Sequence, residues 1–574
     1  MSFLRFALIS VIVLITAYIG LPALYHHLDP HTSQTEEANE DVVWIATSKS
    51  WFDRQACRWI GLCGLAHWHP DPAHISRRRK WLMQGTVRFM RNMDVNNKQS
   101  PVKDNIKSDR AQEEELSHNR ADEKHWAGKF IGDSKTLKEV PKYVLDNAPL
   151  IHLYSGEHFW PSDITEHLIH TTPFLNYSTF NYSKNQYTPY DLYRLNQGYD
   201  GNHIFLQSKD DVEERPDWLG SAYNKPLPYD DDDFTSNDND NDYNEDKKKK
   251  KKKKNDWQAV KNNHLTDENG LRKQAYLDDP IFNVTRKIDL RRSQIYPPQF
   301  LTSSKTVSQP GGYSRAPSIL IIVEKDSGIL DAFWFYFYSY NFGTTVFNIR
   351  FGNHVGDWEH SLIRFKNGVP QAVFFSAHSG GLAYDWNAVE KGKGKGREGR
   401  PVLYSAVGSH AMYATAGKHS YILPFGLLAD VTDKGPLWDP AHNYLAYNYN
   451  TSITHDADAR QSPSNAFSSN SLDLKSMHNL DDSLNSFQPA TCNPSAPLGW
   501  WWYAGRWGDK FYELYDWRQW RFVGQYHYVN GPFGPRFKNL GRANVCQSGS
   551  ECHIMKDLSQ GKSWIKQFSF FSGE

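Results

Sequence analysis

Residues 331–340 are the segment that most restricts the fold of this chain. They run Asp-Ala-Phe-Trp-Phe-Tyr-Phe-Tyr-Ser-Tyr, and aromatic side chains occupy successive positions almost without a break. An extended segment that is apolar on both faces is typical of an inner strand covered on both sides. A second apolar run at residues 318–323 precedes it, and Asp326-Ser327-Gly328 between the two runs is typical of a hairpin turn.

Further short apolar runs follow at residues 359–365, 371–377 and 402–406, with glycine-containing turns between them. Several strands at such spacing indicate sheets packed face to face. We therefore predict a mainly β fold, an antiparallel sandwich-like body with α elements.

Residues 6–24 carry no charged side chain and nearly match the ~20 residues that cross a bilayer core. Arg5 precedes them and acidic residues follow from Asp29 onward, so the positive-inside bias keeps residues 1–5 in the cytosol. We expect a single transmembrane signal anchor over residues 6–25 and a lumenal body. A cleaved signal peptide is the alternative, and it places the body in the same compartment.

Cysteines and glycosylation sequons are compatible with that compartment. Cys57 and Cys63 enclose five residues, as do Cys546 and Cys552, whereas Cys492 is left over. In an oxidising lumen the first four are candidates for two disulfides, but their spacing leaves the connectivity open. Four Asn-x-Ser/Thr sequons are predicted glycosylation sites, at Asn176, Asn181, Asn283 and Asn450.

Shifts in composition divide the chain into segments. After the anchor we expect a stalk, a Trp-rich helical segment and a charged linker over 26–133, followed by the start of the folded body at 140–205. The Asp/Lys-rich insertion 207–270 and the Ser/Asn/Asp-rich insertion 452–490 are predicted to be disordered, because they offer little apolar surface to bury. The β-rich core then covers 275–450, and a Trp-rich part of the body covers 491–574. Equal totals of 65 basic and 65 acidic residues argue against a nucleic-acid partner.

The densest polar cluster is Gly-Asn-His-Val-Gly-Asp-Trp-Glu-His at residues 352–360. Alternate side chains of a strand share a face, so Asp357 and Glu359 should point the same way. If the later runs are neighbouring strands, His378 and His410 approach this pair. Such a set suits one divalent cation, with Mg, Ca or Mn favoured by the oxygen ligands.

Three interpretations of this cluster remain open: a buried structural network, a bound cation, or catalysis by a cation that positions a hydrolytic water. Catalytic residues stay unknown, because no His-Glu-x-x-His motif, nucleophile elbow or phosphate-binding loop is present.

These same segments resemble the fungal vacuolar protein sorting-associated protein 62 family. The matching stretches are Ala-Pro-Leu-Ile-His-Leu-Tyr at 148–154, Phe-Trp-Pro-Ser-Asp-Ile at 159–164, and the segments 331–342, 352–365, 376–384, 407–413 and 437–440. The resemblance implies participation in delivering proteins to the vacuole and a single-pass membrane location. It implies no reaction and no catalytic residues.

A motif-level similarity links the same residues to necrosis-inducing cytolysins. Those proteins bind a divalent cation in a β-sandwich at Gly-His-Arg-His-Asp-Trp-Glu. Asp357, Trp358, Glu359, His378 and His410 match that pattern in order, whereas glycine replaces the histidine that precedes the aspartate.

We therefore predict a non-catalytic component of vacuolar protein sorting, in the membrane of the vacuole or of the secretory and endosomal pathway, with sorting machinery or cargo as partners. Two alternatives are kept. One is a divalent-metal-dependent hydrolase. The other is a lectin-like or lipid-binding module that uses the clustered Trp and Tyr residues of 500–528, among them Trp501 and Trp502.

Overall fold

The structure is a computed structural model, and it describes residues 36–70, 137–179, 186–196, 203–229, 309–422, 428–452, 486–547 and 552–558. Over these ranges the chain is mainly β with few helices, as predicted. The predicted anchor at 6–25 lies outside the described residues, as do most of the charged linker and most of the Asp/Lys-rich insertion. Among the described helices, none has the length and apolar character needed to span a bilayer.

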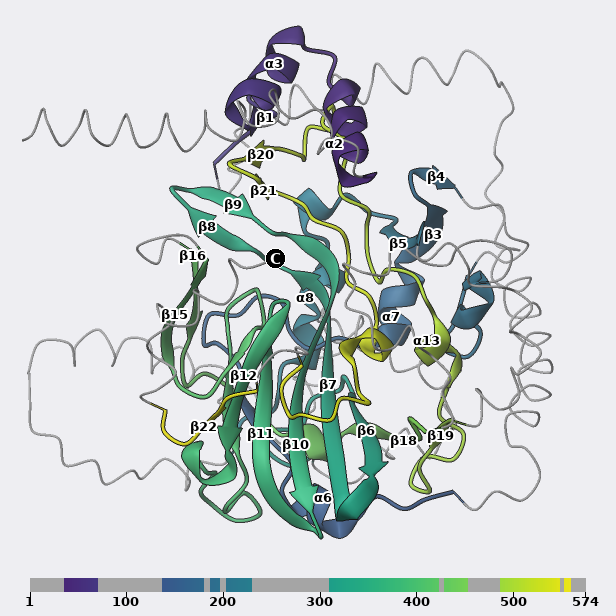
Figure 1. The fold of residues 1–574 in the computed structure, drawn as a ribbon, viewed down its shortest axis with the longest axis vertical. Coiled ribbons are helices and arrows are strands. Elements are labelled where there is room, and N and C mark those ends of the chain that lie inside the picture. The colour runs from purple at the N-terminus through teal and green to yellow at the C-terminus, as the bar shows by residue number, and fades with distance from the viewer. Residues whose placement is uncertain are drawn as a thin grey trace, which may run out of the picture.

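An eight-stranded sheet forms the centre of the body, in the order β19-β18-β6-β7-β10-β11-β12-β22 (Figure 1). Its strands are β6 (Ser318–Lys325), β7 (Ile329–Asn341), β10 (His354–Lys366), β11 (Val369–Ala377), β12 (Gly380–Asp385), β18 (Tyr444–Tyr449), β19 (Phe487–Pro489) and β22 (Ile554–Met555). The aromatic run 331–340 lies in β7, with β6 on one side and β10 on the other. The predicted inner strand is therefore confirmed.

The register of β7 against β10 sorts their side chains onto two faces. Asp357 lies opposite Tyr338 and Glu359 opposite Tyr336, while Trp358 lies opposite Phe337. Opposed residues of an antiparallel pair share a face. The aspartate and glutamate therefore lie on one face and Trp358 on the other, as predicted from their spacing.

A second sheet covers the carboxylate face, in the order β14-β13-β2-β17. Its strands are β2 (Leu150–His152), β13 (Val402–Ser405), β14 (Met412–Tyr413) and β17 (Leu437–Trp438). Trp334 and Tyr336 of the large sheet form one buried cluster with Ile151, Leu403 and Trp438 of the small one. The body is thus a sandwich of two sheets.

The predicted antiparallel pairing holds for the central strands β6, β7, β10, β11 and β12, but three other pairs are parallel. β18 pairs with β6, β22 with β12, and β13 with β2 in parallel. Parallel neighbours need a long connection, and each of these pairs joins segments that are far apart in the chain.

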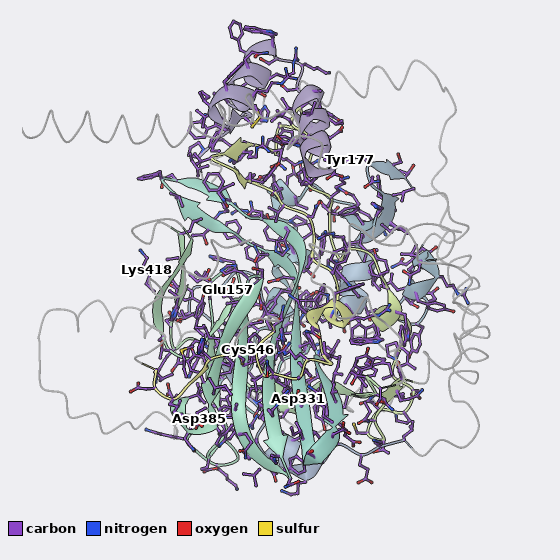
Figure 2. All side chains as sticks on the ribbon, viewed as in Figure 1. Glu157, Tyr177, Asp331, Asp385, Lys418 and Cys546 are labelled. Atoms are coloured by element: carbon purple, nitrogen blue, oxygen red, sulfur yellow. A yellow bond between two sulfur atoms is a disulfide. The ribbon has the colours of Figure 1, made fainter. Side chains whose placement is uncertain are left out.

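Helices and irregular segments cover the opposite face of the large sheet. They include α7 (Ile164–Ile169), α13 (Gly499–Trp502) and the 3₁₀ helix η2 (Leu192–Asn196). Trp500, Trp501 and Trp502 are buried to 8% exposure or less in the cluster with Phe335 and Trp358. These tryptophans belong to the core, so the lectin-like or lipid-binding surface predicted at Trp501 and Trp502 is not present there. Figure 2 shows side chains filling the space on both sides of the sheet.

Smaller elements surround the sandwich. The hairpins β8 (Thr344–Val346)/β9 (Ile349–Phe351) and β15 (Gly417–Ile422)/β16 (Leu428–Thr432), and the sheet β4 (Ser178–Thr179), β3 (Thr171–Leu175), β5 (Ile204–Ser208), lie around its upper half in Figure 1. Outside the N-terminal part, the other described helices are α6 (Lys142–Asp146), α8 (Asp217–Gly220), η4 (Val212–Glu214), η5 (Ala222–Asn224), η8 (Asp326–Gly328), η9 (Trp386–Ala388), η11 (Pro440–His442) and η15 (Pro535–Lys538).

The N-terminal part that follows the predicted stalk is a small unit of its own. It contains α2 (Glu36–Thr47), α3 (Trp51–Ile60) and β1 (Leu62–Cys63), and β1 pairs with β20 (Arg521–Phe522) beside β21 (Gln525–Tyr526). Trp44 fixes α2 to the body, because its indole N–H donates to the Tyr512 carbonyl oxygen at 2.9 Å.

Of the two predicted disordered insertions, the first is ordered at its beginning and the second at its end. Residues 207–229, expected to be disordered, contain the end of β5 and the helices η4, α8 and η5, with Trp218 and Leu219 buried. Residues 486–490, expected to be disordered, contain β19 with Phe487 fully buried. In each case a few large apolar side chains provide the buried area that the polar surroundings lack.

The four cysteines at the ends of the body pair locally: Cys57 with Cys63 and Cys546 with Cys552, while Cys492 is free and exposed. Two of the four sequon asparagines are described. Asn450 is exposed, and the carboxamide oxygen of Asn176 accepts a hydrogen bond from Lys510. Asn181 and Asn283 lie outside the described residues.

Candidate functional site

The start of β10 is shaped by a close approach of another segment. Gly356 has φ +69°, and a Cβ there would lie 2.0 Å from the Trp507 carbonyl oxygen. Only glycine fits such a backbone position. The departure from the cytolysin pattern therefore has a steric cause in this chain, because any side chain immediately before Asp357 would displace the 507–508 segment.

Asp357 is held by His410 from the turn between β13 and β14. The imidazole Nδ1 lies 2.9 Å from Asp357 Oδ2, and Nε2 lies 3.0 Å from the Phe159 carbonyl oxygen. The ring stacks on Tyr338 with 3.7 Å between centroids. Burial alone would lower the pKa of His410, but the hydrogen bond to Asp357 and the charges of Glu157 and Asp357 outweigh it and raise the pKa.

Two oxygen atoms contact the imidazole of His410. The carbonyl oxygen of Phe159 can only accept, so Nε2 carries the hydrogen of that contact, while Nδ1 contacts Asp357 Oδ2. Both nitrogen atoms of His410 are therefore engaged by oxygen atoms of the protein, and neither is directed to the pocket.

Glu359 lies two residues further along β10 in a different environment. The Ser376 hydroxyl donates to Glu359 Oε2. Burial, followed by the charge of Asp357, raises the Glu359 pKa to about 8, against smaller opposite effects of Lys538, Ser376 and His378. The carboxyl is therefore protonated at neutral pH and acts as a hydrogen-bond donor as well as an acceptor.

His378 follows β11 and pairs with an aspartate on another hairpin. Its Nε2 lies 2.7 Å from Asp430 Oδ2 on β16, and Asp430 also accepts from the hydroxyls of Ser409 and Tyr413 at 2.7 Å each. Burial alone would lower the pKa of His378, and the charge of Asp430 and the hydrogen bond to it overcome this and raise the pKa. Burial alone would raise the pKa of Asp430, but the charge of His378 and these three hydrogen bonds lower it.

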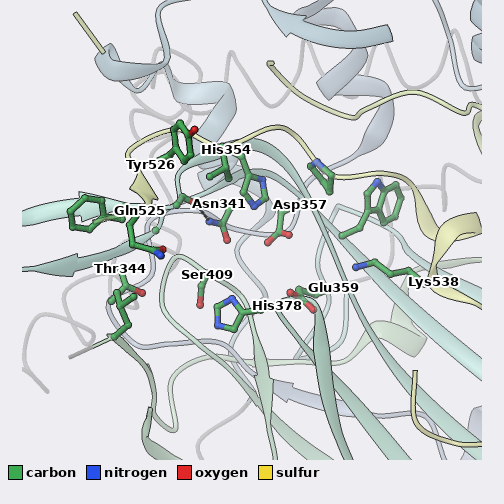
Figure 3. A pocket seen from close by; sticks show the side chains of 18 residues that line it. Asn341, Thr344, His354, Asp357, Glu359, His378, Ser409, Gln525, Tyr526 and Lys538 are labelled. Atoms are coloured by element: carbon green, nitrogen blue, oxygen red, sulfur yellow. Dashed lines mark hydrogen bonds between the residues drawn. The ribbon is translucent and has the colours of Figure 1, made fainter. Parts of the chain in front are cut away.

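These groups surround a pocket of about 350 Å³. Figure 3 shows Asp357, Glu359 and His378 directed toward a common space, with Lys538 reaching in from the C-terminal segment. The lining also includes Asn341, Thr344, His354, Trp358, Ser409, Gln525 and Tyr526. The volume lies within the range of ~300–1,000 Å³ typical of small-ligand sites. It therefore has room for a small ligand or for part of a larger one.

The structure brings three of the four predicted ligands to this pocket. Asp357, Glu359 and His378 line it, whereas His410 is fully buried behind Asp357. In the described part of the chain, no group of three or more His, Cys, Asp or Glu side chains is placed to hold a metal ion. The four-ligand set for Mg, Ca or Mn stays a prediction. In this structure each imidazole is hydrogen-bonded to its own carboxylate, His410 to Asp357 and His378 to Asp430.

Sequence reasoning missed Asp430, Lys538 and His354 as residues of the site. Asp430 lies in the short strand β16 and Lys538 at the end of the 3₁₀ helix η15, and neither stands in a motif that carried a signal. His354 lies within the predicted cluster, where its Nδ1 is 2.6 Å from the Gly356 carbonyl oxygen, and burial lowers its pKa. His419 and Asp439 do not line the pocket, and Asp439 pairs with Arg400 at 2.6 Å.

Comparisons with known proteins place these residues in a family. The model of the family described as vacuolar protein sorting-associated protein 62 matches residues 335–447, which include Asp357, Glu359, His378 and His410. Two solved structures also match, the necrosis and ethylene inducing protein 2 from the causal agent of cocoa's witches' broom disease and a structure described as a toxin fold for microbial attack and plant defense. They are 18% and 15% identical, cover 19% and 18% of this chain and 53% and 48% of those chains, and have TM-scores of 0.13 and 0.14. Similarities this limited do not establish a shared fold or function.

Two curated relatives from Saccharomyces cerevisiae match over most of their length. TDA6, which carries a vacuolar protein sorting-associated name, is 31% identical over 443 residues, 72% of this chain and 69% of that protein. Vacuolar protein sorting-associated protein 62 is 31% identical over 430 residues, 72% of this chain and 70% of that protein. The resemblance predicted from the sequence is confirmed: the chain belongs to the vacuolar protein sorting-associated protein 62 family.

Proposed function

We propose that this chain acts in the delivery of proteins to the vacuole, as a membrane-anchored protein with a lumenal body that binds a ligand and catalyses no reaction. The observation that carries the proposal is the 31% identity to vacuolar protein sorting-associated protein 62 over 72% of this chain and 70% of that protein. The family model matches residues 335–447, which include Asp357, Glu359 and His378 of the pocket.

Two features support a lumenal body. The Cys57–Cys63 and Cys546–Cys552 disulfides belong to a type of bond that persists in the secretory pathway and is rare in the cytosol. Asn450 begins an exposed Asn-Thr-Ser sequon, which the glycosylation machinery of that compartment can use. The uncharged segment 6–24 supplies the anchor.

The chemistry of the pocket favours binding over catalysis. The Ser409 hydroxyl donates a hydrogen bond to Asp430, whose lowered pKa makes it a weak base. A serine nucleophile needs a base that accepts its proton near neutral pH. The Ser409 hydroxyl is bonded to Asp430 and to neither histidine, because His378 and His410 contact Asp430 and Asp357 instead.

Donors dominate the part of the pocket around Glu359. The protonated carboxyl of Glu359, the imidazole of His378, whose pKa the charge of Asp430 raises against the effect of burial, and the amino group of Lys538 all lie on its wall. Three groups that can donate hydrogen bonds suit a ligand that presents several acceptor oxygen atoms. We propose that such a group, on cargo or on a sorting partner, is what the pocket recognises.

Removal of the chain from cells tests the sorting role. Cells without it should secrete a larger fraction of a soluble vacuolar hydrolase into the medium, and re-expression of the full chain should restore retention. A secreted fraction that does not change on removal would contradict a sorting role. Protease treatment of intact vesicles tests the topology separately, because a C-terminal tag should be digested only after detergent is added.

A further inference from the structure

Helix α3 is amphipathic, but its apolar side is exposed and its polar side is buried against the rest of the protein. Trp51 is 58% exposed, Phe52 79%, Trp59 59% and Ile60 43%. Positions separated by four and eight residues share one side of a helix, so these four side chains form one continuous surface, here called the apolar face of α3. Of the two positions between them on this side, one is Ala56 and the other is Gln55, whose side chain accepts from the Trp59 indole at 3.1 Å.

The opposite side of α3 is polar and is fixed to the body. Asp53 is buried and accepts hydrogen bonds from the Ser48 hydroxyl at 2.9 Å and from the backbone N–H of Gly64 at 2.7 Å. Cys57, one turn later, is buried and bonded to Cys63 of β1. A carboxylate network and a disulfide thus prevent the helix from rolling over to bury its tryptophans. The outward orientation is built into the unit.

The apolar face of α3 lies at one end of the molecule. Figure 1 shows α3 at the top, far from the turn between β10 and β11 at the bottom. α2, which packs beside α3, adds Val42 and Val43, which are 57% and 66% exposed. Large apolar side chains gathered on one exposed surface usually mark an interaction site.

The sequence before α2 indicates what contacts the apolar face of α3. The uncharged segment 6–24 ends eleven residues before α2 begins at Glu36. Eleven residues span at most about 40 Å even when fully extended, so α2 and α3 stay close to any bilayer that this segment crosses. Tryptophan is enriched at the membrane–water interface because its ring is apolar and its N–H is polar. Arg58, exposed beside Trp59, can extend its cationic end to lipid headgroups.

We propose that the apolar face of α3 inserts into the lumenal interface of the bilayer crossed by residues 6–25, and so holds the body in a fixed orientation close to the membrane. This inference rests on the proposed membrane anchor. The contact makes the N-terminal unit a second, reversible attachment beside the anchor, and it turns the opposite end of the sandwich toward the lumen.

A lipid-quenching experiment on the full-length chain tests the contact. In a Cys492→Ser background, Phe52→Cys carries an environment-sensitive fluorophore, and the protein is reconstituted into phosphatidylcholine vesicles with or without lipids that bear a nitroxide near the headgroup. We expect the nitroxide to reduce emission at position 52 at least twofold. The control is Val369→Cys at the start of β11, where the native side chain is 59% exposed against 79% for Phe52, and emission there should not change.

The possible outcomes distinguish a failure of the α3 contact with the bilayer from a failure of the membrane anchor. Quenching at position 52 should weaken in Trp51→Ser/Trp59→Ser, while vesicle flotation is retained because residues 6–25 are intact. Emission that is not quenched in protein that floats would overturn the bilayer contact and leave the anchor standing. A blue-shifted but unquenched signal would also overturn it, and would indicate another protein surface as the occupant. Protein that does not float would refute the anchor and this inference together.

Discussion

His410 Nδ1 lies 2.9 Å from Asp357 Oδ2, and this contact joins the turn after β13 to the start of β10 across the two sheets of the sandwich. Glu157 strengthens the same junction, because its carboxylate accepts from the backbone N–H of Gly408 at 2.9 Å and of Phe159 at 2.8 Å. The residues that resemble a catalytic or metal cluster in the sequence are thus partly a structural network that closes one side of the pocket.

The pair His410 and Asp357 predicts a pH-dependent coupling. In a double-mutant cycle with His410→Phe and Asp357→Asn, we expect a coupling of about 2 kcal/mol in the free energy of unfolding near pH 6. The folded-state pKa of His410 is raised above 6.5. The stabilisation is therefore complete below the unfolded pKa and is lost as pH rises through the folded pKa.

Denaturant unfolding of the four proteins from pH 5 to pH 9 measures this coupling. His410 has φ +55°, so His410→Asn serves as a backbone control, because asparagine tolerates that conformation. A coupling that grows toward pH 9 would show that the pair is not an imidazolium with a carboxylate.

Glu359 predicts a second pH effect. Its pKa of about 8 lies above the ordinary value of 4.5, so the unfolded chain loses this proton first as pH rises. Wild-type stability should therefore fall relative to Glu359→Gln between pH 5 and pH 8. Infrared spectroscopy at pH 7 should detect a protonated carboxyl band that is absent from Glu359→Gln. An identical pH profile for the two proteins would mean that Glu359 is ionised.

Gly356 and Gly352 form a matched pair for testing how closely the 507–508 segment packs against the start of β10. Both have positive φ, but a Cβ at Gly356 would lie 2.0 Å from the Trp507 carbonyl oxygen, whereas nothing lies within 4 Å of one at Gly352. Gly352→Ala should cost about 1 kcal/mol from backbone strain alone, and Gly356→Ala about 3 kcal/mol or more. Thermal unfolding of both variants makes the comparison, and equal losses would argue against the close approach.

His360 predicts a stabilising substitution. It is fully buried with neither ring nitrogen hydrogen-bonded, and burial lowers its pKa well below the ordinary value. Phe333, Phe335 and Phe374 surround it. His360→Leu should raise the free energy of unfolding by about 1 kcal/mol, because it removes unsatisfied polar atoms. His360→Gln, which keeps a polar group there, should give no such gain in the same denaturant titration.

Sequence patterns correctly predicted those features that are set by residues adjacent in the chain. The aromatic composition of residues 331–340 was sufficient for an inner strand, and alternation was sufficient to place Asp357 and Glu359 on one face. The contact of His378 with Asp430 was not predictable, because it depends on where the β15–β16 hairpin folds back. Trp218 and Leu219 were missed because the Asp/Lys-rich composition that follows them dominated the interpretation of the whole segment.

The most direct test of the account changes the pocket without changing the fold, and uses the sorting of a soluble vacuolar hydrolase as the readout. Lys538→Gln removes a cationic donor from the pocket wall, and Lys418→Gln removes an exposed lysine outside it. If the pocket binds the ligand that sorting requires, cells with Lys538→Gln should secrete the hydrolase nearly as much as cells without the chain, while Lys418→Gln retains it. Normal retention with Lys538→Gln, in a protein present at wild-type level, would contradict the account.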